Sequence, residues 1–217
     1  VPVALWVLQA PHGTLFGIVQ AREFWHSPLI PPHFASLALV VGTAIVMLLA
    51  ILTSKLGQRE LVSRGTLSHM GKLLAFFITV TLFFDFFDFL ILSYLPTPEK
   101  MEYLNILTGS YAPFVALYIG GLFVALLILL KWGRTIKGLS VASSLIVVAV
   151  AAYRYYFVIV GQLVPLVPGL QGVPEVRYSP TGIEMIVTAG IVALVMLLYT
   201  VLTRVLPMGE NIHEGER

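Results

Sequence analysis

Long apolar stretches separated by short polar breaks run along most of this chain. A helix needs about 20 apolar residues to cross the hydrocarbon core of a membrane, and five stretches meet that length. They cover residues 33–54, 70–95, 113–131, 138–161 and 180–206. The breaks between them contain charged residues, glycine and proline, as expected for loops. The pattern predicts an all-α integral membrane protein, a multi-helix transmembrane bundle with five full spans in this chain.

The predicted five-helix transmembrane bundle covers residues 33–206 and is flanked by residues 1–32 and 207–217. The first apolar run, VPVALWVLQ, has no basic residue before it, which is not typical of a signal peptide. We expect it to be the end of a preceding membrane helix; the alternative is a short interfacial segment at a true N-terminus. The remainder of residues 1–32 is mildly amphipathic and predicts an interfacial segment on the outer face, with Trp25 in the aromatic belt. Residues 207–217 are expected to form a cytoplasmic tail.

Lysine and arginine are distributed unevenly between the two sides of these spans. Nine lie on one side, in the loop and flanks between the first two spans, in the loop between the third and fourth, and in the C-terminal region, whereas three lie on the other side. Cytoplasmic loops carry an excess of these residues. The asymmetry predicts a multi-pass protein with its C-terminus in the cytoplasm.

Composition excludes several classes of protein. Hydrophobic residues make up 58% of the 217 and charged residues 11%, against about 25% charged in soluble domains. The absence of cysteine excludes disulfides, cysteine-ligated iron–sulfur clusters and thiolate zinc sites on this chain. No basic stripe interleaved with aromatic residues indicates a nucleic-acid partner. The histidines lie at or outside span ends, so we do not expect this chain to bind haem.

Four ionisable residues fall inside the spans, and the helical rise places all of them in the outer half of the membrane. They are Asp85, Asp88, Arg154 and Glu184. The two aspartates are three residues apart and share a helix face, and we expect Arg154 to pair with one of them. Three carboxylates against one arginine leave two negative charges. We therefore expect at least one carboxyl group to be protonated at pH 7, unless a cation comes from another chain segment.

Two interpretations of this set remain open. It can be a structural ion pair that fixes helix packing, or a proton path or the edge of a polar cofactor site, as intramembrane ionisable residues often indicate. Tyr153, Tyr156 and Gln162 lie nearby along the fourth span and are candidates for the vicinity of a quinone headgroup. Tyrosines near a membrane surface also serve as anchors.

Three stretches of the sequence resemble the NrfD/PsrC family, the membrane subunits of polysulfide reductase and its relatives. They are GIVQAREFWHSPLIPPHFASLALVVGTAIV, YRYYFVIVGQ and YSPTGIEMIVTAGIVALVMLLYTVLTRVLP. The closest similarity is to the DsrP/HmeB-type integral membrane subunits of menaquinol oxidoreductases. The resemblance covers nearly all of the chain, but only the C-terminal half of a family member.

This resemblance implies an integral membrane subunit of a quinone- or menaquinol-linked respiratory oxidoreductase complex in the prokaryotic cell membrane. Family members bind a quinone near the outer face, hold no haem or iron–sulfur cluster of their own, and anchor an iron–sulfur partner with several clusters there, with other redox subunits. In the family the quinone site belongs mainly to the N-terminal bundle. The resemblance therefore gives Asp85, Asp88, Arg154 and Glu184 a role in a proton path, and assigns no catalytic residue or metal site.

Two other classes of function compete with this one. A proton-coupled secondary transporter would also use buried carboxylates, although transporters usually contain helices broken near the middle of the membrane, and these spans have no such central break. A purely structural membrane anchor would explain the composition but not three carboxylates inside the spans.

Overall fold

The computed structural model describes residues 11–57, 62–94, 97–164 and 178–205. The chain divides into two compact units, Val1–Val173 and Pro174–Arg217. Within these described ranges, five helices are long and apolar enough to cross a membrane. They are α2 (Ile30–Gly57), α3 (Arg64–Tyr94), α5 (Ala112–Trp132), α6 (Ile136–Leu163) and α7 (Gly182–Val205). These helices confirm the prediction of an all-α protein with five candidate spans, and their bounds differ by only a few residues from those predicted.

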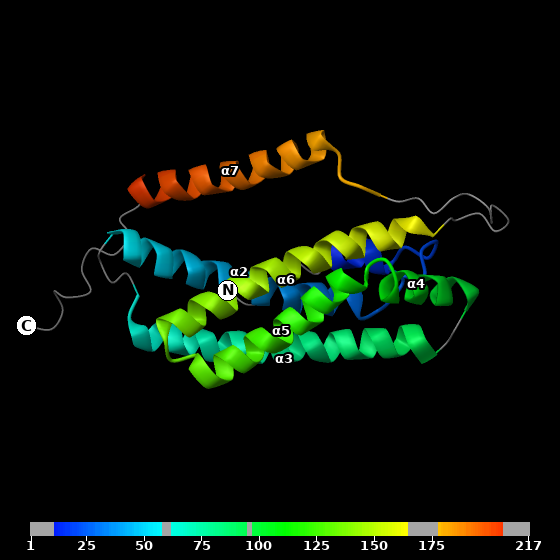
Figure 1. Ribbon diagram of the computed structural model, residues 1–217, viewed down its shortest axis with the longest axis horizontal. Coiled ribbons are helices and arrows are strands. Elements are labelled where there is room, and N and C mark those ends of the chain that lie inside the picture. The colour runs from blue at the N-terminus through cyan, green and yellow to red at the C-terminus, as the bar shows by residue number, and fades with distance from the viewer. Residues whose placement is uncertain (1–10, 58–61, 95–96, 165–177, 206–217) are drawn as a thin grey trace, which may run out of the picture. The chain divides into compact units, whose positions relative to one another are not determined.

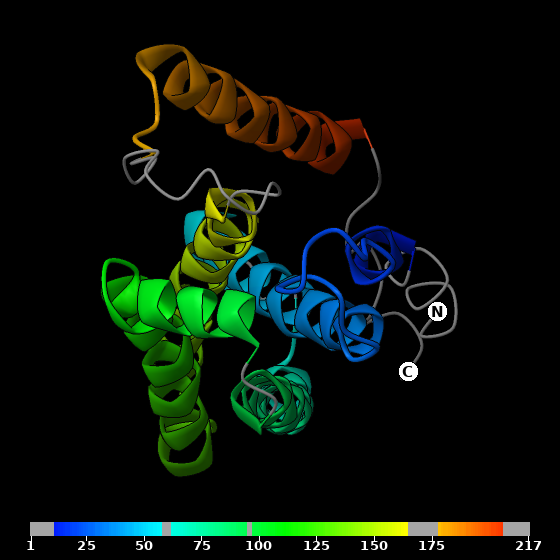
Figure 2. The ribbon, with the colours of Figure 1, turned by 90° about the vertical axis from the view of Figure 1, so that its right-hand side faces the viewer.

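The first unit is built around four antiparallel helices that pack in a ring (Figure 1). In this ring α2 packs on α3, α3 on α5, α5 on α6, and α6 on α2. Figure 2 shows the unit from one end, with α3 seen almost along its axis. Helices α5 and α6 pack closely at Gly121, where an added Cβ atom would lie 2.9 Å from the Cβ of Ala149. Small residues of this kind allow two helix backbones to approach closely.

Local sequence fixes where these helices begin. Two prolines occupy the first turn of α2, and Pro113 the start of α5, where the missing N–H of proline would have no intrahelical partner in any case. Thr135 caps α6 by accepting a hydrogen bond from the Gly138 N–H at 3.1 Å. The interior of the unit is then filled by large apolar side chains from all four helices, among them Leu37, Ile78, Leu122 and Ile146.

A short helix, α4 (Pro98–Thr108), lies at one end of the bundle and was not predicted. Thr97 caps it, accepting from the Lys100 N–H at 3.2 Å and donating to a Glu23 carboxylate oxygen at 2.6 Å. Tyr103 of α4 is buried, and its ring stacks on Phe24 at 5.2 Å between centroids. The helix therefore joins the segment before α2 to the end of the bundle, which we call the α4 end.

The segment before α2 is helical over residues 11–17 and continues in turns up to residue 29. Trp25 is buried rather than placed in an aromatic belt, so that expectation is wrong. Its indole N–H donates to the Phe157 carbonyl at 3.0 Å, and its ring packs directly on Gly161, leaving no room for a Cβ atom there. Arg22 donates to the Val164 carbonyl at 2.6 Å. Two hydrogen bonds and the packing of Trp25 thus hold the segment against the last turns of α6.

Candidate functional site

His33 lies in the first turn of α2, directly after the two prolines, and only 5% of its surface is exposed. Its Nε2 lies 3.0 Å from Oδ1 of Asp85 in α3. Its Nδ1 lies 3.2 Å from the hydroxyl of Tyr153 in α6. Both ring nitrogens are therefore engaged, each by a different helix.

Tyr118 of α5 completes the set. Its hydroxyl donates to Oδ2 of Asp85 at 2.8 Å and lies 3.3 Å from Nε2 of His33. Each helix of the four-helix ring thus contributes one side chain to a single buried group. We call this group the polar cluster: His33, Asp85, Tyr118 and Tyr153.

The polar cluster keeps its hydrogen bonds in two protonation states. With a neutral imidazole, Nε2–H donates to Asp85 while Nδ1 accepts from the Tyr153 hydroxyl. With an imidazolium, both nitrogens donate, and the tyrosine oxygen becomes the acceptor. The contacts of His33 with Asp85 and Tyr153 can therefore hold in either state, and in the imidazolium state the Tyr153 O–H must turn to another acceptor.

Aromatic rings surround the polar cluster. Tyr118 and Tyr153 lie 4.6 Å apart between ring centroids, and Tyr156 meets Tyr153 edge-on at 5.4 Å. Phe157 stacks on Tyr153 from within α6, also at 5.4 Å. These contacts exclude water, so electrostatic interactions within the cluster are stronger than they would be at a surface.

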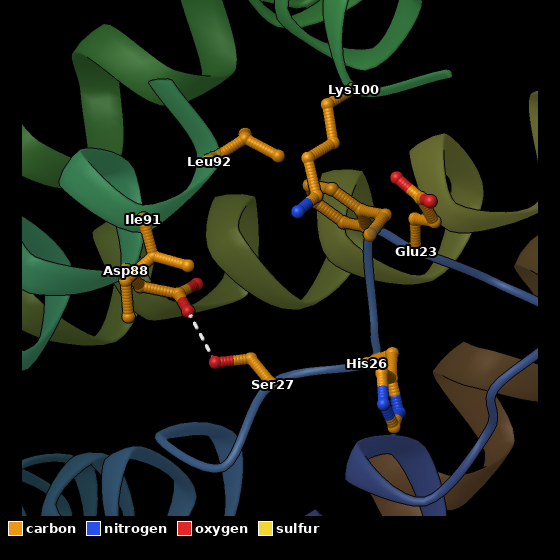
Figure 3. Close-up of a pocket in the computed structure, with 8 residues that line it drawn as sticks. Glu23, His26, Ser27, Asp88, Ile91, Leu92 and Lys100 are labelled. Carbon is orange, nitrogen blue, oxygen red and sulfur yellow. Dashed lines mark hydrogen bonds between the residues drawn. The ribbon is translucent and has the colours of Figure 1, made fainter. Parts of the chain in front are cut away.

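Asp88 occupies the same face of α3 as Asp85, one turn closer to the α4 end. The Ser27 hydroxyl donates to its Oδ1 at 2.9 Å. Asp88 also lines a pocket of about 30 Å³ whose other polar residues include Glu23, His26 and Lys100. Figure 3 shows Asp88 and Ser27 on one side of this pocket and Lys100 and Glu23 facing them.

The predicted pairing of Arg154 with an aspartate is wrong. Among the described residues, the ion pair of Asp85 is with His33. The guanidinium carbon of Arg154 instead lies 4.3 Å from the centre of the Phe34 ring, a cation–π contact. Successive helical residues point about 100° apart, so Tyr153 can face the polar cluster only if its neighbour Arg154 points elsewhere.

Glu184 takes part in a local cap. Its carboxylate accepts from the Thr181 N–H at 2.7 Å and from the Thr181 hydroxyl at 2.9 Å, the arrangement of a capping box. Its side chain is exposed within the second unit, and its part in a buried ion pair stays a prediction. Any role for Glu184 in a proton path stays a prediction.

The quinone-vicinity candidates differ in their surroundings. Tyr153 belongs to the polar cluster and Tyr156 is buried beside it, whereas Gln162 is exposed. His33 was missed because it lies at the edge of the predicted span. The signal that could have found it is its position as the first residue of that span, on the same side of the membrane as the half that holds Asp85.

Comparison with known proteins identifies the family. The family model described as "Polysulphide reductase, NrfD" matches residues 3–167. A subunit of the selenate reductase of Mesobacillus selenatarsenatis is 31% identical over 208 residues, which cover 90% of this chain and 47% of that protein. The Hdr-like menaquinol oxidoreductase integral membrane subunit of Archaeoglobus fulgidus is 27% identical over 204 residues, which cover 87% of this chain and 51% of that protein.

The chain thus spans about half the length of these two relatives. Both relatives are named as subunits of reductases or oxidoreductases, and the family resemblance seen in the sequence is confirmed. With five helices able to cross a membrane and a family match over most of its length, the chain belongs to the NrfD family of integral membrane proteins.

Proposed function

We propose that this chain is part of the membrane subunit of a quinol-linked oxidoreductase complex, and that its polar cluster exchanges protons with the quinone reaction. The names of the two relatives support the first part. The observation that supports the second is the buried His33, held between Asp85 and Tyr153 with a hydrogen bond at each ring nitrogen.

Oxidation of a quinol releases two electrons and two protons. We propose that the electrons go to a redox partner, and the family resemblance supports an iron–sulfur protein in this role. The protons need an acceptor near the ring. His33, with Asp85 beside it, takes one proton at a time and passes it on before the next arrives; quinone reduction runs the same steps in reverse.

The described residues do not fit a quinone ring at Asp88. The pocket there is about 30 Å³, whereas sites for small organic ligands are about 300–1,000 Å³. Tyr153 already hydrogen-bonds to His33. We therefore assign these residues to proton transfer, and propose that menaquinone binds beside this bundle, in contact with another part of the subunit.

The remaining elements of the proposal concern placement. We propose that the protein lies in a prokaryotic cell membrane with its C-terminus in the cytoplasm, because lysine and arginine gather on that side of the spans. The α4 end then faces outward and carries the redox partner.

Replacement of Asp85 tests the role of the polar cluster. In the purified complex, Asp85→Asn should slow quinol-dependent reduction of the redox partner at least tenfold, because proton transfer by a positioned group contributes about 10²–10⁴-fold. Thr79→Ala is the matched control, since this exposed hydroxyl on α3 bonds only to the Ala75 carbonyl. An assembled Asp85→Asn complex that turns over at the parental rate would refute the proton role.

A further inference from the structure

The polar cluster has different surroundings toward the two ends of the bundle. Toward the α4 end, ionisable side chains continue from the cluster to a pocket. Toward the opposite end, apolar side chains close over it. This asymmetry decides with which face of the membrane the cluster can exchange protons.

Three steps connect the polar cluster to the α4 end. Asp85 and Asp88 are three residues apart on one helix face, so their Cβ atoms lie about 5–6 Å apart, a gap that one water molecule can bridge. Asp88 accepts from the buried Ser27 at 2.9 Å. It also lines the pocket that Glu23 and Lys100 share (Figure 3). At about 30 Å³ this pocket exceeds the roughly 10–15 Å³ that a cavity needs to hold a water molecule.

Two buried hydroxyl groups extend the polar cluster toward the other end. Thr81, one turn from Asp85 on α3, donates to the Ser36 hydroxyl at 3.2 Å, and Ser36 donates to the His33 carbonyl at 2.8 Å. Beyond them, the next buried polar side chain among the described residues is Ser143, whose hydroxyl lies 3.6 Å from the sulfur of Met47. Ser36 and Met47 are 11 positions apart on α2, about 16 Å at 1.5 Å per residue.

The intervening space is filled by aliphatic side chains from all four helices, which we call the apolar layer. Its members are Val40, Ala44, Leu74, Ile78, Leu122 and Ile146, each 0% exposed. A proton moves along a chain of hydrogen-bonding groups spaced about 2.8 Å apart, so a 16 Å gap would need roughly five ordered water molecules. Close-packed aliphatic interiors do not hold such waters, because each water needs two to four polar partners.

We propose that the polar cluster is a one-sided proton terminal, which opens to the α4 end through Asp88 and Ser27 and is sealed from the opposite face by the apolar layer. This inference rests on the proposed function and specifies the direction of its protons. Protons released by quinol oxidation leave at the α4 end. The four-helix bundle itself carries no protons across the membrane.

A proton-flux measurement tests the seal. The purified complex is reconstituted in vesicles that contain a pH-sensitive dye, and a potassium gradient with valinomycin supplies the driving potential. We expect the parental complex and Asp85→Asn to admit protons at the same rate, within twofold. Parental flux that exceeds the Asp85→Asn flux by more than this would overturn the inference, because it would show a route through the cluster and the layer.

Cysteine accessibility gives a second measurement that does not depend on the Asp85 variant. The chain has no cysteine of its own, so a labelled chain reports the introduced position. A small thiosulfonate reagent should modify Ser27→Cys from one face of the membrane and leave Ala44→Cys unmodified from both. Modification of Ala44→Cys in an assembled, active complex would show water in the apolar layer and overturn the seal.

The two proposals fail in different ways. If Asp85→Asn lowers the quinol rate while the parental complex leaks protons through the cluster, the proposed function stands and the one-sided terminal is wrong. If Asp85→Asn keeps the parental quinol rate, the cluster has no proton role and both proposals fall.

Discussion

Nε2 of His33 and Oδ1 of Asp85 lie 3.0 Å apart and connect the first turn of α2 to the second half of α3. Hydroxyl groups from α5 and α6 bond to the same two side chains. The pair therefore links all four helices of the ring at one level, and changes to either residue should affect both proton transfer and the stability of the bundle.

A double-mutant cycle measures that link. His33→Gln and Asp85→Asn should each lower the free energy of unfolding by about 1–3 kcal/mol, because each leaves a buried partner poorly satisfied. Together they should show a coupling of about 0.5–3 kcal/mol, measured by denaturant unfolding in detergent. Additive effects would indicate that the two side chains act independently. Thr79→Ala should stay within about 0.5 kcal/mol of the parent.

The tyrosines of the polar cluster should be distinguishable from their neighbour. Tyr118→Phe removes the hydroxyl that donates to Asp85, and should slow quinol-linked turnover and cost about 1–3 kcal/mol of stability. Tyr156→Phe is the control, since Tyr156 contributes an edge-on ring contact to Tyr153 that phenylalanine retains. If the two variants behave alike in turnover and in thermal unfolding, the hydroxyl of Tyr118 has no special role.

Because Trp25 packs directly on Gly161, the addition of one methyl group at position 161 should destabilise the protein. In Gly161→Ala the new Cβ would overlap the Trp25 indole, so the ring must move, at a cost of about 1–3 kcal/mol. Gly120→Ala is a matched control, because nothing lies within 4 Å of a Cβ at that position. Its melting temperature should equal or slightly exceed the parental value. A Gly161→Ala variant that melts with the parent and keeps its tryptophan fluorescence would contradict this packing.

Arg154 should act independently of the aspartates. Arg154→Leu removes a cation–π contact with Phe34 that is worth about 0.5–2 kcal/mol. Combined with Asp85→Asn, its effect on unfolding should be additive within about 0.5 kcal/mol. If Asp85→Asn instead rescues the stability of Arg154→Leu, the two side chains interact, and the ion pair predicted from the sequence is correct.

Topology can be tested on the same cysteine-free background. With the proposed orientation, a membrane-impermeant maleimide applied to intact cells should label Glu102→Cys in α4 and leave Ser63→Cys, before α3, unlabelled. Both positions are exposed, so reactivity after cell lysis serves as the control for each. The opposite labelling pattern would reverse the orientation.

The sequence was sufficient to predict the long helices, because apolar length is set locally. It did not predict α4, whose 11 residues carry an uneven mixture of apolar and polar side chains and no strong periodicity. That helix depends on its Thr97 cap and on the burial of Tyr103 against Phe24. The cap is local, but the burial of Tyr103 and the bond from the Thr97 hydroxyl to Glu23 are contacts with a distant part of the chain.

The candidate site was predicted only in part. Helical rise gives the depth of a residue, and the contact of His33 with both Asp85 and Tyr153 confirms that the latter two lie at one level of the bundle. Rise does not give the rotation of each helix about its axis, which depends on packing with its neighbours. Arg154 and Tyr153 have nearly the same depth, and rotation alone decided which of them faces the aspartates.

The depth of Asp85 along α3 also has an electrical consequence. Asp85 lies nine residues before the end of α3 at Tyr94, about 13 Å along its axis. If this 31-residue helix is centred on a hydrocarbon core of about 30 Å, Asp85 is about 5 Å inside the core, or roughly a sixth of its thickness. A charge that crosses the whole core gains about 2.3 kcal/mol per 100 mV, so a proton that reaches Asp85 from the α4 end gains or loses only about 0.4 kcal/mol. The proton affinity of this site should therefore change only about twofold when the membrane potential changes by 100 mV. The complex should then be able to work both with and without a large membrane potential.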